Sequence, residues 1–260
     1  MHHAHIDKFA YQDSIIHRLD ARVKLIVTVI FTSIVLSLPK MSLSILTCFA
    51  IGPFTILVLG KIPLKFVAKQ ILIVSPFILV LALSCPWYDR TPQDIFFGPF
   101  CWQTTLGWLK GCTIAGKFAV TMLALIALAS TTRFADLLAG MHKLRLPSVL
   151  IMQLGFLYRY IFVLIDKVHH MLQARAARRL KNLGVKKEFK IAVSMIGSLL
   201  IRSIDTAERI NIAMQARGFN GTWPTISNLK IKRSDFLFVS IAVIFMITLY
   251  FFVAPVLIHG

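Results

Sequence analysis

Acidic residues are scarce in this chain. Its 260 residues include 11 Asp and Glu against 29 Lys and Arg, so the formal net charge is +18. In a soluble protein such a charge would suggest binding to nucleic acid. Here the basic residues flank or separate apolar runs, as the cytoplasmic loops of membrane proteins do. We therefore expect contact with a lipid bilayer and no nucleic-acid partner.

Cysteine is also rare, with four residues at scattered positions that have no metal-binding spacing. Cys85 and Cys101 fall in one expected external loop, where they could pair. Two incidental thiols are the interpretation that we favour.

Motifs of the common enzyme classes are missing. The sequence holds no GxSxG or HExxH motif and no convincing pair of carboxylates within an apolar run. Asp166, Asp205 and Glu208 lie among Arg and Lys on expected helices, where structural ion pairs are the simpler interpretation. We predict a non-catalytic protein without a bound cofactor. We also expect no cleavable signal peptide, because the first apolar run begins only near Val23.

One segment imitates a phosphate-binding loop. Residues 111–118 read GCTIAGKF, with Phe118 where that motif has the Ser or Thr that binds magnesium. The surrounding sequence is an apolar helix rather than a strand, and glycines in such a helix allow close helix packing. We therefore predict no ATP site in this chain.

Histidines do not form a convincing metal site either. His2, His3 and His5 cluster in a terminal segment and would bind a metal only weakly and unselectively. His169 and His170 are adjacent on an expected helix, so their side chains point about 100° apart. We assign no metal site.

Long apolar runs dominate the rest of the chain, which is 57% hydrophobic and has a mean hydropathy of +0.74. This composition predicts an all-α, polytopic membrane protein. We expect five membrane spans, at about 23–38, 43–59, 66–83, 106–130 and 236–258. Residues 85–105, rich in Pro, Gly and aromatic residues, are expected to form an external loop. The basic segments place the N-terminus in the cytoplasm and the C-terminus outside.

The part between the fourth and last spans is different, because its apolar residues are often interrupted by basic ones. We expect helices at about 133–143, 148–182 and 188–217, with Gly184 as the terminator of the second. The two long helices are amphipathic, partly at membrane depth and projecting into the cytoplasm. The expected organisation is a membrane region (1–132), a cytoplasmic coupling region (133–233) and a last membrane helix (234–260).

The last of these helices ends in a distinctive way. Its charged residues are three or four positions apart, so that neighbours can form ion pairs: Arg202, Asp205, Glu208 and Arg209. Gly218 is expected to end the helix in the left-handed conformation. Ala216, Arg217 and Gly218 then form a small tip whose guanidinium can reach a carboxylate partner.

A second basic helix end occurs at Ala177, Arg178 and Arg179, with Ala174-Arg175-Ala176 as an alternative register. From composition alone, both ends could equally be positive-inside charges or anchors for anionic lipid head groups.

The chain resembles the T components of energy-coupling factor (ECF) transporters, most of all the CbiQ branch that serves cobalt uptake. The resemblance covers nearly the whole length and is carried by Ile6-Asp7-Lys8, residues 16–24, Tyr158-Arg159-Tyr160 with Asp166, and residues 197–219. The Ala-Arg-Gly signature of that family matches Ala216, Arg217 and Gly218. Ala21 stands where many members have proline, and Arg179 stands where many have glycine in the first signature.

The resemblance implies a non-catalytic coupling subunit in a bacterial or archaeal cell membrane. Such a subunit joins a pair of cytoplasmic ATP-binding cassette subunits to a CbiM-like substrate-binding membrane subunit, with a small CbiN-like subunit as a further candidate. The two Ala-Arg-Gly-type helix ends would dock to the ATPase pair and transmit its motion. Cobalt import would then support cobalamin synthesis.

Other functions remain open from the sequence. The same role could serve nickel or a vitamin, because another subunit selects the cargo. A stand-alone secondary carrier or channel needs polar residues within its spans, and Lys110 and Lys117 are the obvious candidates. A membrane enzyme is less favoured, for want of a catalytic constellation.

Overall fold

The structure is a computed structural model. It describes residues 12, 14, 16–38, 43–88, 92–97, 100–178, 184–219, 221 and 233–258. The chain divides into two compact units. Unit 1 consists of Met1–Gly140 together with Ser227–Gly260, and unit 2 of Met141–Ile226. The division at 132 and 233 expected from the sequence stays a prediction.

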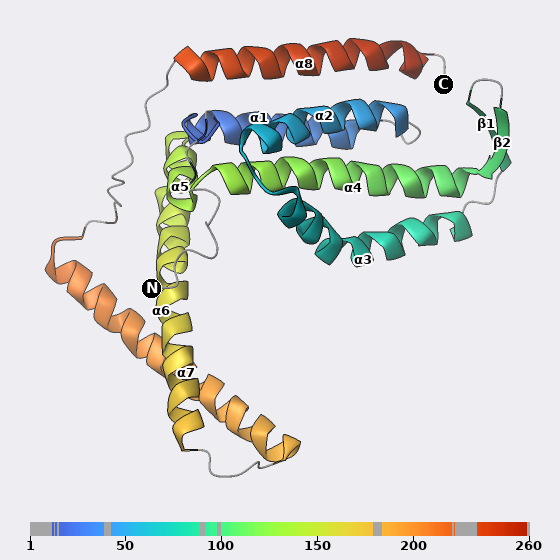
Figure 1. The fold of residues 1–260 in the computed structure, drawn as a ribbon. Helices are drawn as coiled ribbons and strands as arrows, with labels where there is room; N and C mark the ends of the chain where they lie inside the picture. The colour runs from blue at the N-terminus through green and yellow to red at the C-terminus, as the bar shows by residue number, and fades with distance from the viewer. Residues whose placement is uncertain are drawn as a thin grey trace. The chain divides into compact units, whose positions relative to one another are not determined.

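Unit 1 contains helices and one β-hairpin (Figure 1). In chain order these are α1 (Ala21–Ser37), α2 (Leu43–Leu59), α3 (Leu64–Tyr88), β1 (Pro92–Phe97), β2 (Phe100–Thr105), α4 (Leu106–Thr131) and α8 (Arg233–Ile258). Helix α5 (Phe134–Lys143) crosses the boundary between the units in the sequence. The predicted all-α fold is confirmed, and the five expected spans correspond to α1, α2, α3, α4 and α8.

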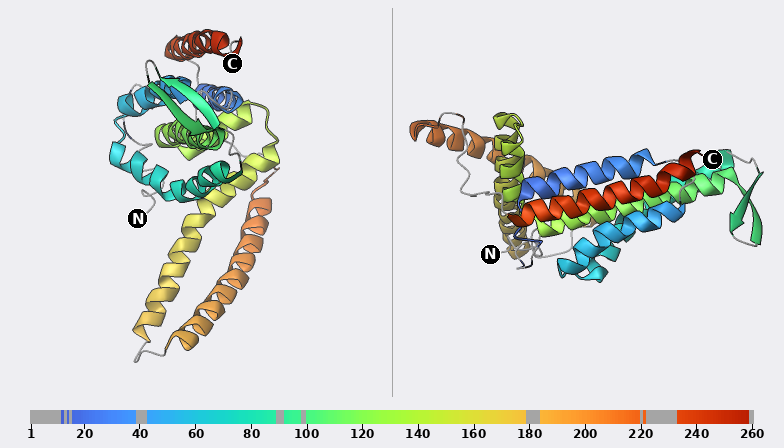
Figure 2. Two further views of the ribbon diagram at one scale, coloured as in Figure 1. Left: turned by 90° about the vertical axis from the view of Figure 1, so that its right-hand side faces the viewer. Right: turned by 90° about the horizontal axis from the view of Figure 1, so that it is seen from above.

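Helix α4 is the centre of unit 1. Seen along the helix axes, it lies among α1, α2 and α3 and contacts each of them (Figure 2). Its Val120 and Ala124 join a buried apolar cluster with Phe31 of α1 and Phe49 of α2. Further along, Ile126 and Ala127 join a second cluster that includes Leu57, Ile62 and Val67. Burial against this single long helix therefore holds α1, α2 and α3 together, whereas α8 packs on α1 and α2.

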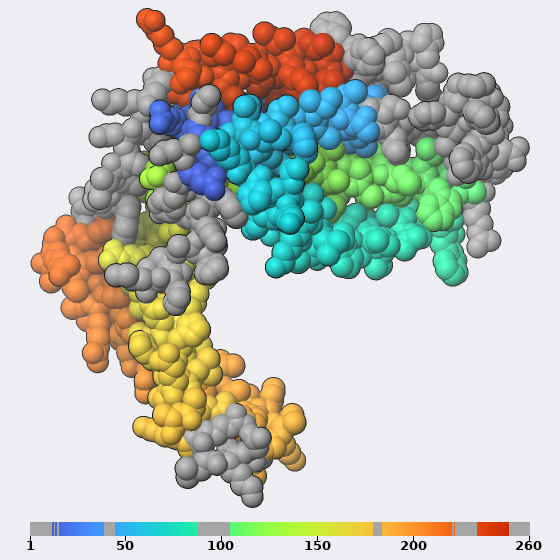
Figure 3. Space-filling view, viewed as in Figure 1, coloured from blue at the N-terminus to red at the C-terminus, as the bar shows by residue number. Residues whose placement is uncertain are grey.

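Apolar side chains also cover much of the outer surface. Leu72, Phe77 and Val80 of α3 are strongly exposed, and α3 forms one flank of unit 1 in the space-filling view (Figure 3). Among the described residues, α3, α4 and α6 (Ser148–Ala177) are long and apolar enough to cross a membrane, and α2 holds a shorter apolar helix. Such surfaces are stable in lipid. The sequence analysis predicts that only part of α6 lies at membrane depth.

The segment after α3 differs from the prediction. Helix α3 continues through Pro86 to Tyr88, and the expected loop contains the antiparallel hairpin, with Ile95 paired to Trp102. Aromatic and β-branched residues in both halves favour strands. The prediction weighed Pro and Gly too heavily against this pattern.

Unit 2 is an antiparallel pair of long helices, α6 and α7 (Val185–Ala216), which lie side by side in Figure 2. Lys167 Nζ of α6 donates to Thr206 Oγ1 of α7 at 2.8 Å, and Arg175 of α6 forms an ion pair with Glu188 of α7. Helix α6 ends at Ala177, before the expected 182. The prediction that Gly184 terminates α6 is wrong. Gly184 occupies the N-cap position of α7, with φ +80°.

Candidate docking ends of helices α6 and α7

The C-terminal end of α7 closes as the sequence predicts. Phe219 N donates to Met214 O at 3.0 Å, and Gly218 N donates to Gln215 O at 3.0 Å. These two bonds define a Schellman motif. Gly218 has φ +77°, a conformation that a residue with Cβ rarely adopts. The chain therefore turns away sharply after Arg217.

Ala216 and Arg217 are both exposed at this end. Arg217 is the C-cap residue, and the described residues give its side chain no hydrogen bond or ion pair. A positive charge is favoured here, because the last carbonyl groups of a helix carry partial negative charge. The end therefore presents a guanidinium that no described residue of the chain neutralises.

The end of α6 is built in a similar way. Ala177 is its last residue and Arg178 its C-cap, whose N–H donates to Arg175 O at 3.1 Å. Both Ala177 and Arg178 are exposed. Arg179, the third residue of the predicted signature, lies outside the described residues.

The arginines of the two possible registers of this first signature have different surroundings. Arg175 is about three-quarters buried and pairs with Glu188 across the hairpin. Arg178 has no side-chain partner among the described residues. An arginine that already holds α6 to α7 is less available to another protein, so the geometry favours Arg178 over Arg175.

Arg202, Asp205, Glu208 and Arg209 all lie on α7 and are all exposed. Within the described part of the chain, no ion pair joins these four side chains, and their pairing stays a prediction. Arg202, Asp205 and Arg209 line a shallow hollow of about 470 Å³ with Lys167 and Thr206. The contact that is formed there is the Lys167–Thr206 hydrogen bond.

The residues of the false phosphate loop have structural roles. A Cβ on Gly111 would lie 2.5 Å from the carbonyl oxygen of Ala82, so this glycine lets α4 approach α3, as predicted. Lys117 Nζ donates to Leu36 O at 3.1 Å and to Leu38 O at 2.6 Å. Lys117 thus satisfies carbonyl groups at the C-terminal end of α1, a role that the sequence did not reveal.

Sequence reasoning also missed a buried polar cluster in unit 1. Asp235 Oδ1, at the start of α8, accepts a hydrogen bond from Asp20 N at 3.0 Å. Asp20 caps α1 through Arg22 N at 2.9 Å, and Lys24 Nζ donates to Thr131 O at 2.9 Å. The sequence did contain a signal for this cluster. Asp20 directly precedes the apolar helix α1, and Asp235 lies in the first turn of the apolar helix α8.

Metal-binding groups do not gather in the described residues, where no three His, Cys, Asp or Glu side chains lie together as a metal site needs. His169 and His170 are exposed on α6. His2, His3 and His5 lie outside the described residues. Cys85 is a free thiol, and the side chain of Cys101 is not among those described.

Comparison with known proteins gives a consistent result. The family model CbiQ, described as cobalt transport protein, matches residues 12–227. The nickel permease LarQ of Lactiplantibacillus plantarum is 31% identical over 190 residues, which cover 66% of this chain and 68% of that protein.

Two further relatives span more of this chain. The energy-coupling factor transporter transmembrane protein EcfT of Bacillus selenitireducens is 27% identical, over 83% of this chain and 84% of that protein. The cobalt transport protein CbiQ of Rhodobacter capsulatus is also 27% identical, over 76% and 77% respectively. These names confirm the resemblance found in the sequence, and the apolar helices agree with a multi-pass membrane protein. The chain belongs to the CbiQ family of cobalt transport proteins.

Proposed function

We propose that this chain is the coupling subunit of an ATP-driven importer for cobalt or a related cargo. In this role, Ala216-Arg217-Gly218 and Ala177-Arg178-Arg179 dock to a pair of cytoplasmic ATP-binding cassette subunits. The helices behind these ends transmit the motion of the pair to a substrate-binding membrane subunit. The chain itself performs no catalysis.

The observation that carries the proposal is the placement of the two ends within unit 2. Arg178 follows the end of α6, next to the start of α7, whereas Arg217 lies at the far end of α7. The 32 residues of α7 separate them by about 48 Å. Two exposed arginines this far apart suit two separate protein grooves better than one.

Charge supports a cytoplasmic position for these ends. The basic residues of α6 and α7 greatly outnumber the acidic ones, and positive segments are retained on the cytoplasmic side. With the N-terminus on the same side, both ends face the compartment that supplies ATP.

The description of the family and the names of the relatives support the choice of cargo. Cobalt is the leading candidate, because the matching family model carries that description. Nickel is the second, because the LarQ permease is similar to this chain. Deleting the gene and measuring the cellular content of both metals would separate them.

Reversing the charge of Arg217 tests the docking role. We expect Arg217→Glu to reduce co-purification of the ATPase subunits at least tenfold, because a glutamate would repel groove carboxylates and the negative end of α7. Membrane insertion should be unchanged, since the side chain is exposed. Lys190→Glu makes the same charge change at another exposed site of α7 and should retain the subunits. Normal recovery with Arg217→Glu would remove this end from the proposal.

The register of the other end needs a different design. Arg178→Glu should weaken ATPase recovery, whereas Arg175→Glu would place two glutamates together and loosen the hairpin. The double variant Arg175→Glu with Glu188→Arg keeps the ion pair in reversed order and should retain the subunits. Loss of the subunits in this charge-swapped variant would favour the alternative register at Arg175.

A further inference from the structure

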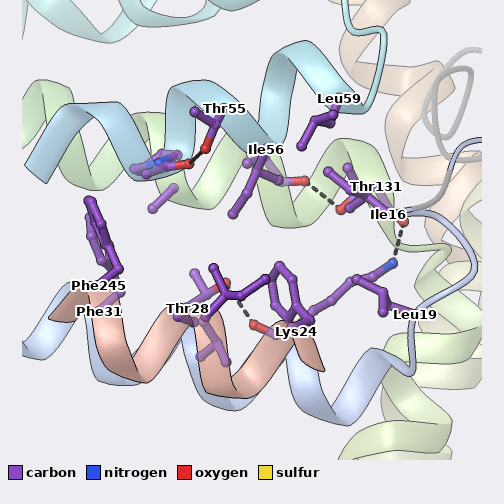
Figure 4. Close-up of a pocket in the computed structure, with 18 of the residues that line it drawn as sticks. Ile16, Leu19, Lys24, Thr28, Phe31, Thr55, Ile56, Leu59, Thr131 and Phe245 are labelled. Carbon is purple, nitrogen blue, oxygen red and sulfur yellow. Dashed lines mark hydrogen bonds between the residues drawn. The ribbon is translucent and has the colours of Figure 1, made fainter. Parts of the chain in front are cut away.

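Unit 1 contains an apolar cavity that is separate from the docking ends. Its volume is about 600 Å³, and its walls come from α1, α2, α4 and α8. Figure 4 shows Phe31 of α1, Ile56 of α2 and Phe245 of α8 on these walls. We call this space the unit 1 cavity.

The side chains that line the unit 1 cavity are poorly covered by protein. Leu59 of α2 is 59% exposed, and Leu237 and Ile241 of α8 are 63% and 59% exposed, although all three face the cavity. Leu237, Ile241 and Phe245 recur every four residues, so one whole face of α8 borders the space. Helix α8 comes close to α2 at one point, because a Cβ on Gly52 of α2 would lie 2.9 Å from the ring of Phe245.

The unit 1 cavity is open on one side, because several of its lining side chains are more than half exposed. In a bilayer, an apolar surface of this kind is covered by hydrocarbon. Water is a poor candidate along most of the walls, because it needs two to four polar partners there. The lining is almost wholly hydrocarbon, so the occupant must be hydrocarbon too.

The polar groups of the unit 1 cavity gather at one end. Lys24 and Thr131 lie there beside Ile16 and Leu19 (Figure 4). The ammonium group of Lys24 has three N–H donors, and Thr131 O takes one of them at 2.9 Å. The described residues give it no second acceptor, although the charges of Asp20, Asp136 and Asp235 act on it. The cavity is therefore amphipathic, with a hydrogen-bond donor at one end of an apolar channel.

The dimensions fit a lipid chain. The wall that α8 contributes runs from Ser234 to Met246, a length of about 18 Å. One leaflet of a bilayer contributes about 15 Å of hydrocarbon. We propose that the unit 1 cavity holds one acyl chain of a membrane lipid, with the carbonyl oxygen of that chain at Lys24. The chain acts as a structural ligand that completes the packing of α8.

Filling the cavity tests this assignment. Ala242 lines the cavity from α8, whereas the neighbouring Val243 does not line it and is 44% exposed. Full-length protein is purified from membranes and exchanged through delipidating detergent, and the retained lipid is measured by mass spectrometry. We expect about one acyl lipid per protein in the parent, at least a fivefold loss in Ala242→Phe, and no loss in Val243→Phe. Ala242→Leu, a smaller change, should show a partial loss if the phenylalanine variant does not fold.

The mass of the retained molecule identifies the source of the chain. A phospholipid mass supports the assignment to a membrane lipid, whereas a free fatty acid mass in its place would overturn that assignment. Equal retention by Ala242→Phe and Val243→Phe would show surface lipid only and would overturn the assignment. So would a parent protein that retains no acyl lipid.

Discussion

Unit 1 and unit 2 are both helical, but they reach stability in different ways. Unit 1 has continuous buried clusters around α4, in which Phe49 and Val35 have no exposed surface. In unit 2, Ile151 is the apolar residue that the described part of α6 buries, and α7 buries none. Polar cross-links, Lys167–Thr206 and Arg175–Glu188, join the two helices instead.

Unit 2 therefore leaves much of its apolar surface uncovered by the described residues. Phe189, Ile196, Leu200 and Ile204 of α7 leave a row of exposed apolar surface. Hydrocarbon exposed in this way favours a partner or a lipid surface. Four substitutions, which differ in the size of their expected effects, test this contrast between the units.

The largest effect is expected from emptying the core of unit 1. Phe49→Ala should lower the free energy of unfolding by about 3–5 kcal/mol, because it leaves a cavity where Phe49 packs against Phe31. Phe189→Ala, on a residue of α7 that is 70% exposed, should change it by less than about 0.5 kcal/mol. Both are measured by denaturant titration of the isolated chain in mixed micelles. Equal effects would contradict the contrast between the units.

The contact between α1 and α8 comes next. Asp235 is 1% exposed and accepts from Asp20 N. Asp235→Asn removes a charge-assisted acceptor and should cost about 1.5–3 kcal/mol. The same change at the exposed Asp205 is the matched control and should be nearly silent. If the midpoints of thermal unfolding for the two variants coincide, Asp235 does not stabilise unit 1.

A substitution at Gly111, where α4 packs against α3, should lower the free energy of unfolding by a similar or smaller amount. Gly111→Ala brings a Cβ against the backbone of Ala82 and should cost about 1–3 kcal/mol, because α3 and α4 must separate. Gly116→Ala meets the flexible end of Leu46 at 3.2 Å and should be tolerated better. Thermal unfolding followed by gel filtration would rank the two variants, and the reverse order would contradict the packing role.

The smallest effect is expected within unit 2. Arg175→Gln removes the partner of Glu188, and a partly exposed pair of this kind contributes about 0.2–1 kcal/mol. Hydrogen exchange of the amides near the α6–α7 connection should rise, while exchange in α4 stays unchanged. Added salt should reproduce the effect in the parent, because screening weakens an exposed pair. A change in α4 exchange would mean that the pair acts beyond its own unit.

Much of the fold could be predicted from periodicity and end signals. The apolar runs located α1, α2, α4 and α8 to within a few residues, and Gly218 marked the end of α7. Local sequence fixes such features, because a helix end depends on residues close to it. The helical context of Gly111 was also predicted from the sequence, and Gly111 lies within α4.

The remaining features depend on partners that are distant in the sequence. Asp20 meets Asp235 across 215 positions, and Lys117 reaches Leu36 across 81. Nothing in the neighbourhood of either residue specifies such a partner. Gly184 was assigned to the wrong helix because glycine is compatible with both a C-terminal end and an N-cap. The Arg175–Glu188 pair, which distinguishes Arg175 from the exposed Arg178 at the end of α6, became apparent only in the folded hairpin.

The bond between Asp20 and Asp235 has a consequence for how the protein is made. Asp235 is synthesised after the whole of unit 2, so this bond cannot form while the ends of α6 and α7 are emerging from the ribosome. Contacts of such high sequence separation form late in folding. A chain that ends before α8 therefore keeps the Asp20 cap of α1 but has no Asp235 to accept from Asp20 N. The start of α1 is thus completed only by the last helix to be synthesised.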